Sequence, residues 1–445
     1  MSAVPVDSPP LPPSRSEGGG RRRVVVTGVG MVTPLGHDAE STWSALCEGR
    51  SGVSFITDFP TEKLRSDIAA SVRDYDPKKH LSSKESDIYG RVVPFALGAA
   101  IEALAQAGLD NPKAEGEVAR PGDTSRLGAD PARVGCLMST GQGAVDIFEQ
   151  QILKSAERGP RAVSPFFIPS VMLNVVSALV SMRYGLMGPS YNIASACATG
   201  THSIATSALM IEAGEADVMV AGGCEAATRL NTVAGFGNAR ALGRSIDGDP
   251  TKTSRPFDKK RNGFVMGEGA GALVLEEEEH AKKRGARILA RLSGFGMTSD
   301  GYHLTGPHAE GLGLRLAIER ALARAGIGPG DIGYINPHAT STPQGDVAEV
   351  AALRQVFGDA LAAVPVSATK SMLGHLLGGA GGVESAVTVL SIRDQKLHPS
   401  INVDELDPEL ALRLVREQTP ADVRYALKIS AGFGGHNCAL VFGRA

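Results

Sequence analysis

Hydrophobic and polar positions along the chain follow two alternating patterns. Short runs of mainly apolar residues at 24–26, 133–138 and 332–336 are typical of buried strands. Segments 92–108 and 382–393 instead place small and apolar residues at helical spacing over several turns. Strands that alternate with helices in this way predict an α/β fold, in which helices cover a largely buried sheet.

The same succession of elements occurs twice. The sequence ALAQAG at 103–108 matches ALARAG at 321–326, and each follows Ala-Ile-Glu within a residue and leads to a strand and a polar turn. A strand, a turn and a helix of small residues around Cys197 likewise match residues 363–397. The sequence therefore predicts two similar α/β halves.

We place these halves at 21–280 and 281–445. Residues 1–20 are rich in Pro, Ser and Gly and have no apolar period, so a disordered N-terminal tail is predicted there. The charged segment EEEEHAKKRGAR at 276–287 lies near the boundary of the halves. We interpret it as a solvated surface helix, because both signs of charge alternate along it.

A single cysteine, Cys197, lies among Ala, Ser, Thr and Gly in the segment NIASACATGTHSIA at 192–205. Residues 191–193 are predicted to end a strand and a helix is predicted from Thr201 to Gly214, which puts Cys197 on a tight strand-to-helix turn. Free backbone N–H groups and the helix dipole at such a turn favour a thiolate. The turn thus suits a nucleophile, although a buried, inert cysteine on a helix has the same pattern.

Composition excludes several classes of protein. A formal net charge of -3 over 445 residues argues against a nucleic-acid binder. The five scattered cysteines form no CxxC pair and no zinc spacing, so we expect a reducing, cytoplasmic setting and no metal. No stretch has the length to span a membrane or the apolar core of a signal peptide. The segment TGVG at 27–30 resembles a dinucleotide loop, but Pro34 and Gly36 delay the next helix, so no nucleotide site is predicted.

Three polar clusters in the second half could carry chemistry. His338 directly follows a predicted strand, in NPHATST, and Lys370 and His375 share the segment TKSMLGH. A glycine-rich turn, GFGGHN, lies between predicted strands at 425–429 and 438–442. Open α/β sheets bind their ligands at such strand ends. Taken singly, each histidine is also typical of a surface loop, and the glycines are typical of a hairpin.

Together with the Cys197 turn, these clusters resemble the β-ketoacyl-acyl-carrier-protein synthases of the elongating type, from Arg23 to the C-terminus. The resemblance implies the thiolase fold, two similar ααβαβ halves stacked as five αβαβα layers, usually in a homodimer. It rests on motifs in one order: VVVTGVGMVTPLG (24–36), SPFFIPSVMLN (164–174), SACATG (195–200), RPFDKKRNGFVMGEGAG (255–271), HATSTPQGD (338–346), TKSMLGHLLGGAGGVE (369–384) and GFGGHN (432–437).

The resemblance implies a ping-pong reaction in fatty-acid or type II polyketide synthesis, with acyl and malonyl forms of an acyl carrier protein as partners. Cys197 takes the acyl group, and malonyl carrier protein then loses carbon dioxide so that its carbanion attacks the acyl-cysteine. By the same resemblance, the backbone N–H groups of Cys197 and Phe433 hold the oxyanion. His338 and His375 hydrogen-bond the malonyl thioester oxygen, where enolate charge develops. No metal or redox cofactor is implied.

Supporting roles are implied as well. Lys370 beside Glu384 orients the site and balances its charge, and Phe433 gates the acyl pocket. Gln142 lines the far end of the acyl channel, where relatives often have an apolar residue. Ala431 stands where many relatives have an aromatic residue, which widens or loosens the entrance.

Carrier docking is implied at two basic positions, Lys84 and Arg240. Asp87 and Ile88, however, stand where relatives often carry Arg or Lys. Because a carrier protein is acidic, we expect docking to be weaker or tuned to a different carrier.

Other interpretations stay open. A biosynthetic thiolase would have a cysteine just before its C-terminal glycine run, where this chain has Ala431. Synthases that start chains from acyl-CoA use Cys-His-Asn, whereas here His375 takes the third place. A non-catalytic chain-length subunit of a ketosynthase heterodimer would lack the nucleophile, so Cys197 argues against that interpretation.

Overall fold

The computed structural model describes residues 22–111 and 124–445, and the predicted tail at 1–20 lies outside them. Ten strands form one sheet: β1 (Val24–Val32), β4 (Val134–Thr140), β5 (Val218–Glu225), β6 (Gly269–Glu277), β7 (Ala290–Ser299), β8 (Ile332–Asn336), β9 (Pro365–Val366), β11 (Arg413–Leu414), β13 (Tyr425–Gly432) and β14 (His436–Gly443). Their order is β11-β9-β8-β13-β14-β7-β1-β6-β5-β4. The two halves of the chain therefore occupy the two ends of this sheet, and they meet where β7 lies beside β1.

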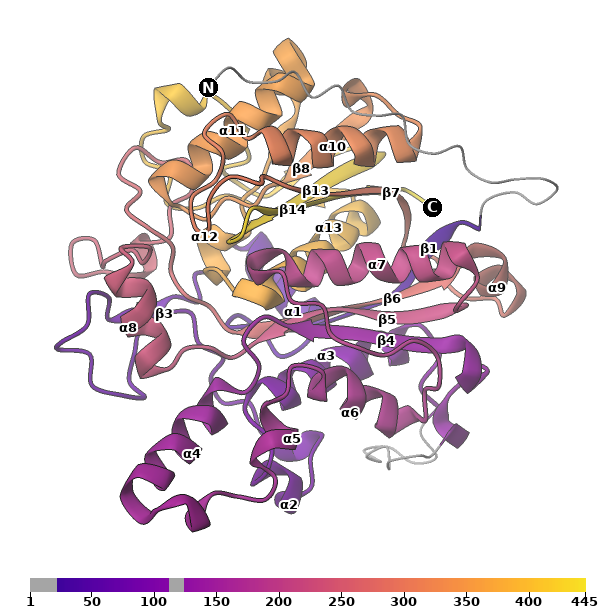
Figure 1. Ribbon diagram of the computed structural model, residues 1–445. Helices are drawn as coiled ribbons and strands as arrows, with labels where there is room; N and C mark the ends of the chain where they lie inside the picture. Colours follow the sequence, from indigo (N-terminus) through magenta and orange to yellow (C-terminus); the bar gives the residue numbers. More distant parts are fainter. Residues whose placement is uncertain (1–21, 112–123) are drawn as a thin grey trace.

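Helices lie in three layers around the two ends of the sheet (Figure 1). α3 (Val92–Gln106) and α6 (Val175–Tyr184) pack on the outer face of the first half. α10 (Leu312–Ala325), with α11 (Pro343–Phe357) beside it, covers the outer face of the second half. α7 (Thr199–Ala213) and α13 (Ala380–Asp394) lie between the halves and contact strands of both. This is the five-layered αβαβα thiolase fold that the sequence predicted.

Strand pairing repeats from one half to the other. In the first half β1 is antiparallel to β6, β6 is antiparallel to β5, and β5 is parallel to β4. In the second half β7, β14, β13 and β8 take the same places with the same directions. The prediction of two similar halves is confirmed by this equivalence.

The remaining helices and strands connect these layers or lie at the periphery. They are α1 (Ala39–Cys47), β2 (Ser54–Phe55), β3 (Ile68–Ala69), α2 (Ser83–Ser86), α4 (Val145–Arg158), α5 (Phe167–Val171), α8 (Leu230–Asn238), α9 (Glu278–Lys283), α12 (Lys370–Leu373), β10 (Lys396–Leu397) and β12 (Thr419–Pro420). Within the described ranges, no helix has both the length and the apolar character needed to cross a membrane.

The central helix α13 is buried on every side. Residues from Ala380 to Ile392 are all buried, which is the pattern of a helix enclosed by protein rather than of an amphipathic surface helix. Two of its hydroxyl groups bond back to the helix itself, Thr388 to the carbonyl of Glu384 at 2.7 Å and Ser391 to that of Val387 at 2.9 Å. The mostly small side chains of α13 thus let strands of both halves pack closely against it.

Glycines in β1 serve packing, not phosphate binding. The strand was predicted at 24–26 but continues to Val32, through the TGVG segment. A Cβ atom at Gly28 would lie 2.0 Å from the carbonyl oxygen of Ala103, and one at Gly30 would lie 2.0 Å from that of Ala99. Helix α3 can therefore pass this close to β1 only where β1 has glycine.

The prediction of a strand end at 191–193 is wrong. Only the preceding Ser190 forms a parallel bridge, to Cys136 of β4, in the position that β9 takes beside β8. At the next positions side chains replace the backbone ladder: the N–H of Thr140 donates to Asn192 Oδ1 at 2.8 Å, and the N–H of Ile193 donates to Ser139 Oγ at 3.1 Å. An asparagine amide can complete the bonds of a neighbouring strand without a strand of its own.

The charged helix predicted at 276–287 is shorter and less solvated than expected. β6 runs to Glu277, so α9 begins only at Glu278. Glu276 is fully buried and accepts hydrogen bonds from Arg284 at 2.6 and 2.7 Å and from Thr27 at 3.0 Å. Its neighbours within the segment supply the counter-charge that makes this burial tolerable. The proposed division of the chain at residue 280 lies within α9.

Candidate active site

The predicted nucleophile, Cys197, lies on a tight 3-10 turn, Ala196–Ala198, that runs directly into α7. The first turns of α7 hold it: the N–H of Ser195 donates to Thr199 Oγ1 at 2.9 Å, and Ser195 Oγ bonds His202 Nδ1 at 2.8 Å. Ala196 has φ of 49°, a left-handed conformation that alanine adopts rarely. Such local strain is found where the surroundings fix a functional geometry.

The turn between β13 and β14 approaches the Cys197 turn closely. A Cβ atom at Gly432 would lie 2.7 Å from the carbonyl oxygen of Ser195 and 3.1 Å from the nitrogen of Cys197. With glycine there, the N–H groups of Phe433 and of Cys197 itself both reach the Cys197 sulfur. These are the two donors expected to hold the oxyanion.

The thiol of Cys197 is protonated at rest, contrary to the expectation of a thiolate. Although part of the side chain is accessible, its protein surroundings desolvate the sulfur, and this burial raises the pKa of Cys197 to about 11. The charge of Lys370 and the N–H groups of Phe433 and Cys197 lower that pKa, but burial outweighs them. The turn supplies the N–H donors that were predicted. The local sequence does not show, however, how strongly the folded protein desolvates the sulfur.

His338 and His375 lie together as predicted. Their ring centroids are 5.3 Å apart and the ring planes cross at 86°. The Glu349 carboxylate fixes the His338 turn, since it accepts the N–H of His338 at 2.5 Å and that of Ala339 at 2.7 Å. His375 is fixed by its own N–H, which donates to the carbonyl of Val265 at 2.7 Å.

Both histidines are buried donors without a protein partner. Within residues 22–111 and 124–445, Nδ1 of His338 and both ring nitrogens of His375 find no hydrogen bond. Burial, and after it the positive charges of Lys370 and Lys428, hold the pKa of each imidazole well below its ordinary value. The pair is therefore neutral and can donate to an oxygen that gains negative charge.

Lys370 and Glu384 form the predicted ion pair, and a third charge joins them. Lys370 Nζ donates to Glu384 Oε1, and Lys428 Nζ lies 2.8 Å from Glu384 Oε2. Sequence reasoning missed Lys428. Its signal was a single lysine inside an otherwise apolar strand, YALKI, a position where a cation requires a buried partner.

Sequence reasoning also missed Glu225, at the end of β5. Its carboxylate accepts Thr140 Oγ1 at 2.7 Å and the N–H groups of Gly141, Gln142 and Gly378 at 3.0 to 3.1 Å. Burial raises its pKa to about 7. The Gln142 turn is thereby anchored to the glycine-rich turn that follows His375.

The remaining predicted residues lie around or away from this centre. Phe433 is 36% exposed, and its ring lies 6.3 Å from that of Phe236. Gln142 and Ala431 are half-buried, with Ala431 opposite Asn437 in the β13–β14 pairing. Lys84 on α2 and Arg240 after α8 are exposed on separate peripheral elements (Figure 1).

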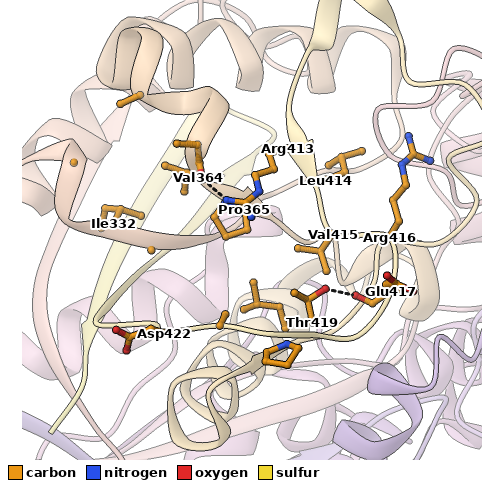
Figure 2. A pocket seen from close by; sticks show the side chains of 17 residues that line it. Ile332, Val364, Pro365, Arg413, Leu414, Val415, Arg416, Glu417, Thr419 and Asp422 are labelled. Carbon is orange, nitrogen blue, oxygen red and sulfur yellow. Dashed lines mark hydrogen bonds between the residues drawn. The ribbon is translucent and has the colours of Figure 1, made fainter.

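A surface hollow of about 860 Å³ lies elsewhere, at the β9–β11 edge of the sheet. Figure 2 shows its lining, which includes Val364, Pro365, Arg413 and Thr419. Arg413 donates to the carbonyl of Ala363 at 2.7 Å, so its guanidinium is already engaged. None of the predicted site residues lines this hollow, so the candidate active site lies elsewhere in the molecule.

Comparison with known proteins agrees with this geometry. The profile described as "Beta-ketoacyl synthase, N-terminal domain" matches residues 21–281, and "Beta-ketoacyl synthase, C-terminal domain" matches residues 289–404. The chain is 44% identical to 3-oxoacyl-acyl-carrier-protein synthase 2 of Vibrio harveyi, over 95% of this chain and 98% of that protein. The 3-oxoacyl-acyl-carrier-protein synthase 2 of Staphylococcus aureus is 41% identical to the chain, over 95% of this chain and 98% of that protein.

Solved structures give the same result. A β-ketoacyl synthase from Burkholderia phymatum superposes with a TM-score of 0.85 at 34% identity, covering 95% of this chain and all of that one. A type II polyketide ketosynthase superposes with a TM-score of 0.85 at 31% identity, covering 96% of this chain and all of that one. That structure is described as a complex with its acyl-carrier protein, bound to a hexaketide. Fold, site and near full-length identity agree, and the chain belongs to the β-ketoacyl synthase family of condensing enzymes.

Proposed function

We propose that this chain extends an acyl group, held on Cys197, with malonyl carrier protein to give a β-ketoacyl carrier protein. The observation that supports this most is the neutral histidine pair, His338 and His375, whose ring nitrogens are open and which shares the neighbouring charge of Lys370 with Cys197. Enolate chemistry needs donors of this kind, because negative charge appears on a thioester oxygen only as the reaction proceeds.

In the first half-reaction, the Cys197 sulfur attacks the carbonyl carbon of an acyl thioester. The carbonyl oxygen becomes an oxyanion that accepts from the N–H groups of Cys197 and Phe433. The carbon–sulfur bond to the carrier then breaks, and the carrier thiol leaves with the proton that Cys197 gave up. A thioester on Cys197 is the product.

In the second half-reaction, the bond from the malonyl methylene to its carboxylate breaks and carbon dioxide leaves. The electron pair passes to the thioester, whose oxygen accepts hydrogen bonds from His338 and His375 as an enolate. The enolate carbon attacks the acyl carbonyl on Cys197, and the thiolate leaves and takes up a proton. Lys370, fixed by Glu384, balances the charge behind both histidines.

Partners follow from the same proposal. One relative of known structure is a ketosynthase in complex with its acyl-carrier protein, and another is described as the ishigamide ketosynthase and chain length factor, at 32% identity. We propose acyl and malonyl carrier proteins as substrates, a homodimer or a heterodimer as the assembly, and a cytoplasmic setting. The exposed cations Lys84 and Arg240 are proposed to meet the acidic carrier.

The decisive experiment mixes the protein with acyl and malonyl carrier proteins and measures the intact mass of protein and products. We expect the protein to gain the acyl mass at Cys197 and the carrier to gain a chain longer by two carbons. An acylated protein that extends nothing would indicate a thiolase-like activity. No acylation at all would favour the non-catalytic chain-length subunit and contradict the proposal.

The acyl pocket is the part of the site where specificity is expected to differ from that of relatives. Gln142 is half-buried and carries a side-chain amide. Its backbone N–H donates to Glu225 Oε1 at 3.1 Å, which fixes the position of the residue. A side-chain amide held against methylenes costs about 1–3 kcal/mol when it lacks partners. We propose that Gln142 and Ala431 together favour acyl chains that are unsaturated, oxygenated or long enough to pass Gln142.

The corresponding prediction concerns Gln142→Ile. This variant should raise the elongation rate of a saturated acyl carrier relative to a polyunsaturated one of matched length, by about 5- to 150-fold if the full amide cost is removed. Competition between the two carriers, read out by mass, measures the ratio. An unchanged ratio, with wild type preferring the saturated chain, would mean that the amide is bonded elsewhere, for example across a dimer interface, and that the pocket is ordinary.

A further inference from the structure

Lys428 is a charged residue at the centre of an apolar strand. It lies on β13 between the buried Leu427 and Ile429, and its side chain is 0% exposed. A cation is carried into a protein core only where partners replace its hydration. The question is therefore what the ammonium of Lys428 does there.

Its partners connect it to the active site. Lys428 Nζ lies 2.8 Å from Glu384 Oε2, donates to the carbonyl of Ile429, and lies 3.2 Å from Ser430 Oγ. Glu384 Oε1 is the acceptor for Lys370. One buried carboxylate is thus shared by two ammonium groups, and the rotation of Glu384 is fixed from both ends.

Lys428 is also connected to the helix of the nucleophile through hydroxyl groups. Ser430 Oγ bonds Thr201 Oγ1 at 2.7 Å, in the first turn of the helix that follows Cys197. Two residues after Ser430, Gly432 passes the Cys197 turn, and Phe433 directs its N–H to the sulfur. Lys428 therefore lies on the same strand that leads to one of the two oxyanion donors.

Its charge also reaches the histidines. Lys428 lowers the pKa of both His338 and His375, in the same direction as burial and Lys370. Two carboxylates belong to the same set of groups: Glu349 on α11 accepts the N–H of His338, and Glu384 on α13 pairs with both lysines. Removing the positive charge of Lys428 would leave the carboxylates of this set less well balanced.

We propose that Lys428 is a positioning residue for the condensation, which holds Glu384 against Lys370 and supplies the second positive charge behind His338 and His375. This role rests on the proposed condensing function. It acts on the second half-reaction, because the charge of Lys428 acts on both histidines, which are proposed to hold the malonyl enolate in that step.

The test compares Lys428→Met with the wild-type protein in two assays, from neutral pH down to the lowest pH at which both proteins stay folded. One assay measures acylation of Cys197 by intact mass, and the other measures release of carbon dioxide from malonyl carrier protein. The neutral histidines are the active form, so the rate falls as pH drops through their pKa. Without the Lys428 charge that pKa rises, so the acidic pH at which carbon dioxide release falls off should be higher in the variant than in wild type.

At the acidic end of the range the variant should then release carbon dioxide more slowly than wild type, whereas acylation changes little. Lys428→Arg keeps the charge and should leave the fall-off at the wild-type pH. Lys428→Gln, which removes the charge but keeps hydrogen-bonding groups, should shift the fall-off as Met does. Thermal unfolding of each variant shows whether it is folded.

The role of Lys428 would be overturned if the Met and Gln variants fold and their carbon dioxide release falls off at the same acidic pH as in wild type. Equal losses of acylation and carbon dioxide release at every pH would overturn it as well. Failure of both neutral variants to fold, while Arg folds, would make the role structural and also overturn it. If wild type itself releases no carbon dioxide, the proposed function fails, and that outcome is separate from these.

Discussion

Cys197→Ala is expected to abolish formation of the acyl-enzyme. No other cysteine can replace it, because Cys47, Cys136, Cys224 and Cys438 are buried, whereas Cys197 is partly accessible. Removing the nucleophile of an acyl-transfer enzyme lowers turnover by a factor on the order of 10⁶. Intact-mass analysis after incubation with an acyl carrier protein measures the effect directly.

Cys136→Ala is the matched control, since Cys136 is a buried cysteine of β4 outside the site. It should be acylated as fast as wild type. An acyl mass on the Cys197→Ala variant, mapped to another residue, would show that the nucleophile has been assigned wrongly.

Loss of either histidine is expected to separate the two half-reactions. His338→Ala and His375→Ala should still accept the acyl group on Cys197, because neither ring is bonded to the Cys197 turn in the described contacts. Each should slow condensation by about 10²–10³, the usual cost of removing one donor to a developing oxyanion. Rapid-quench acylation and the yield of extended chain measure the two steps.

His375→Asn should retain more condensation than His375→Ala, because an amide can still donate a hydrogen bond. His37→Ala, a histidine remote from the site that bonds the carbonyl of Arg73, serves as the control and should leave both steps unchanged. Wild-type condensation in both alanine variants would refute the donor roles, and equal loss of acylation would move the histidines into the first half-reaction.

Much of the fold was predictable because burial leaves local patterns. The strand at 332–336 has the same bounds in the structure, and the helix predicted to stop at Gly214 ends there in a left-handed residue, with φ of 84°. Motif order also placed Cys197, His338, His375 and Lys370 at strand ends or helix starts, where the structure brings them into one site.

What could not be predicted depends on contacts between distant segments. Lys428 has no local signature of its partner, since Glu384 comes from a helix across the core. The protonation of Cys197 is set by how completely both halves enclose it, whereas the local turn indicated a thiolate. Likewise, Asn192 bonds to β4 through its side chain, so an extended-looking segment is not a strand.

The position of β13 and β14 has a consequence for the order in which the molecule matures on the ribosome. The Cys197 turn is synthesised in the first half, yet Lys370, Lys428 and the Phe433 N–H are contributed by segments made much later. β13 lies between β8 and β14 in the sheet, and β14 in turn pairs with β7, so these strands close the site last. A growing chain thus contains Cys197 well before the segments that complete its site, so we expect capture of acyl thioesters only after the second half has been made and has docked.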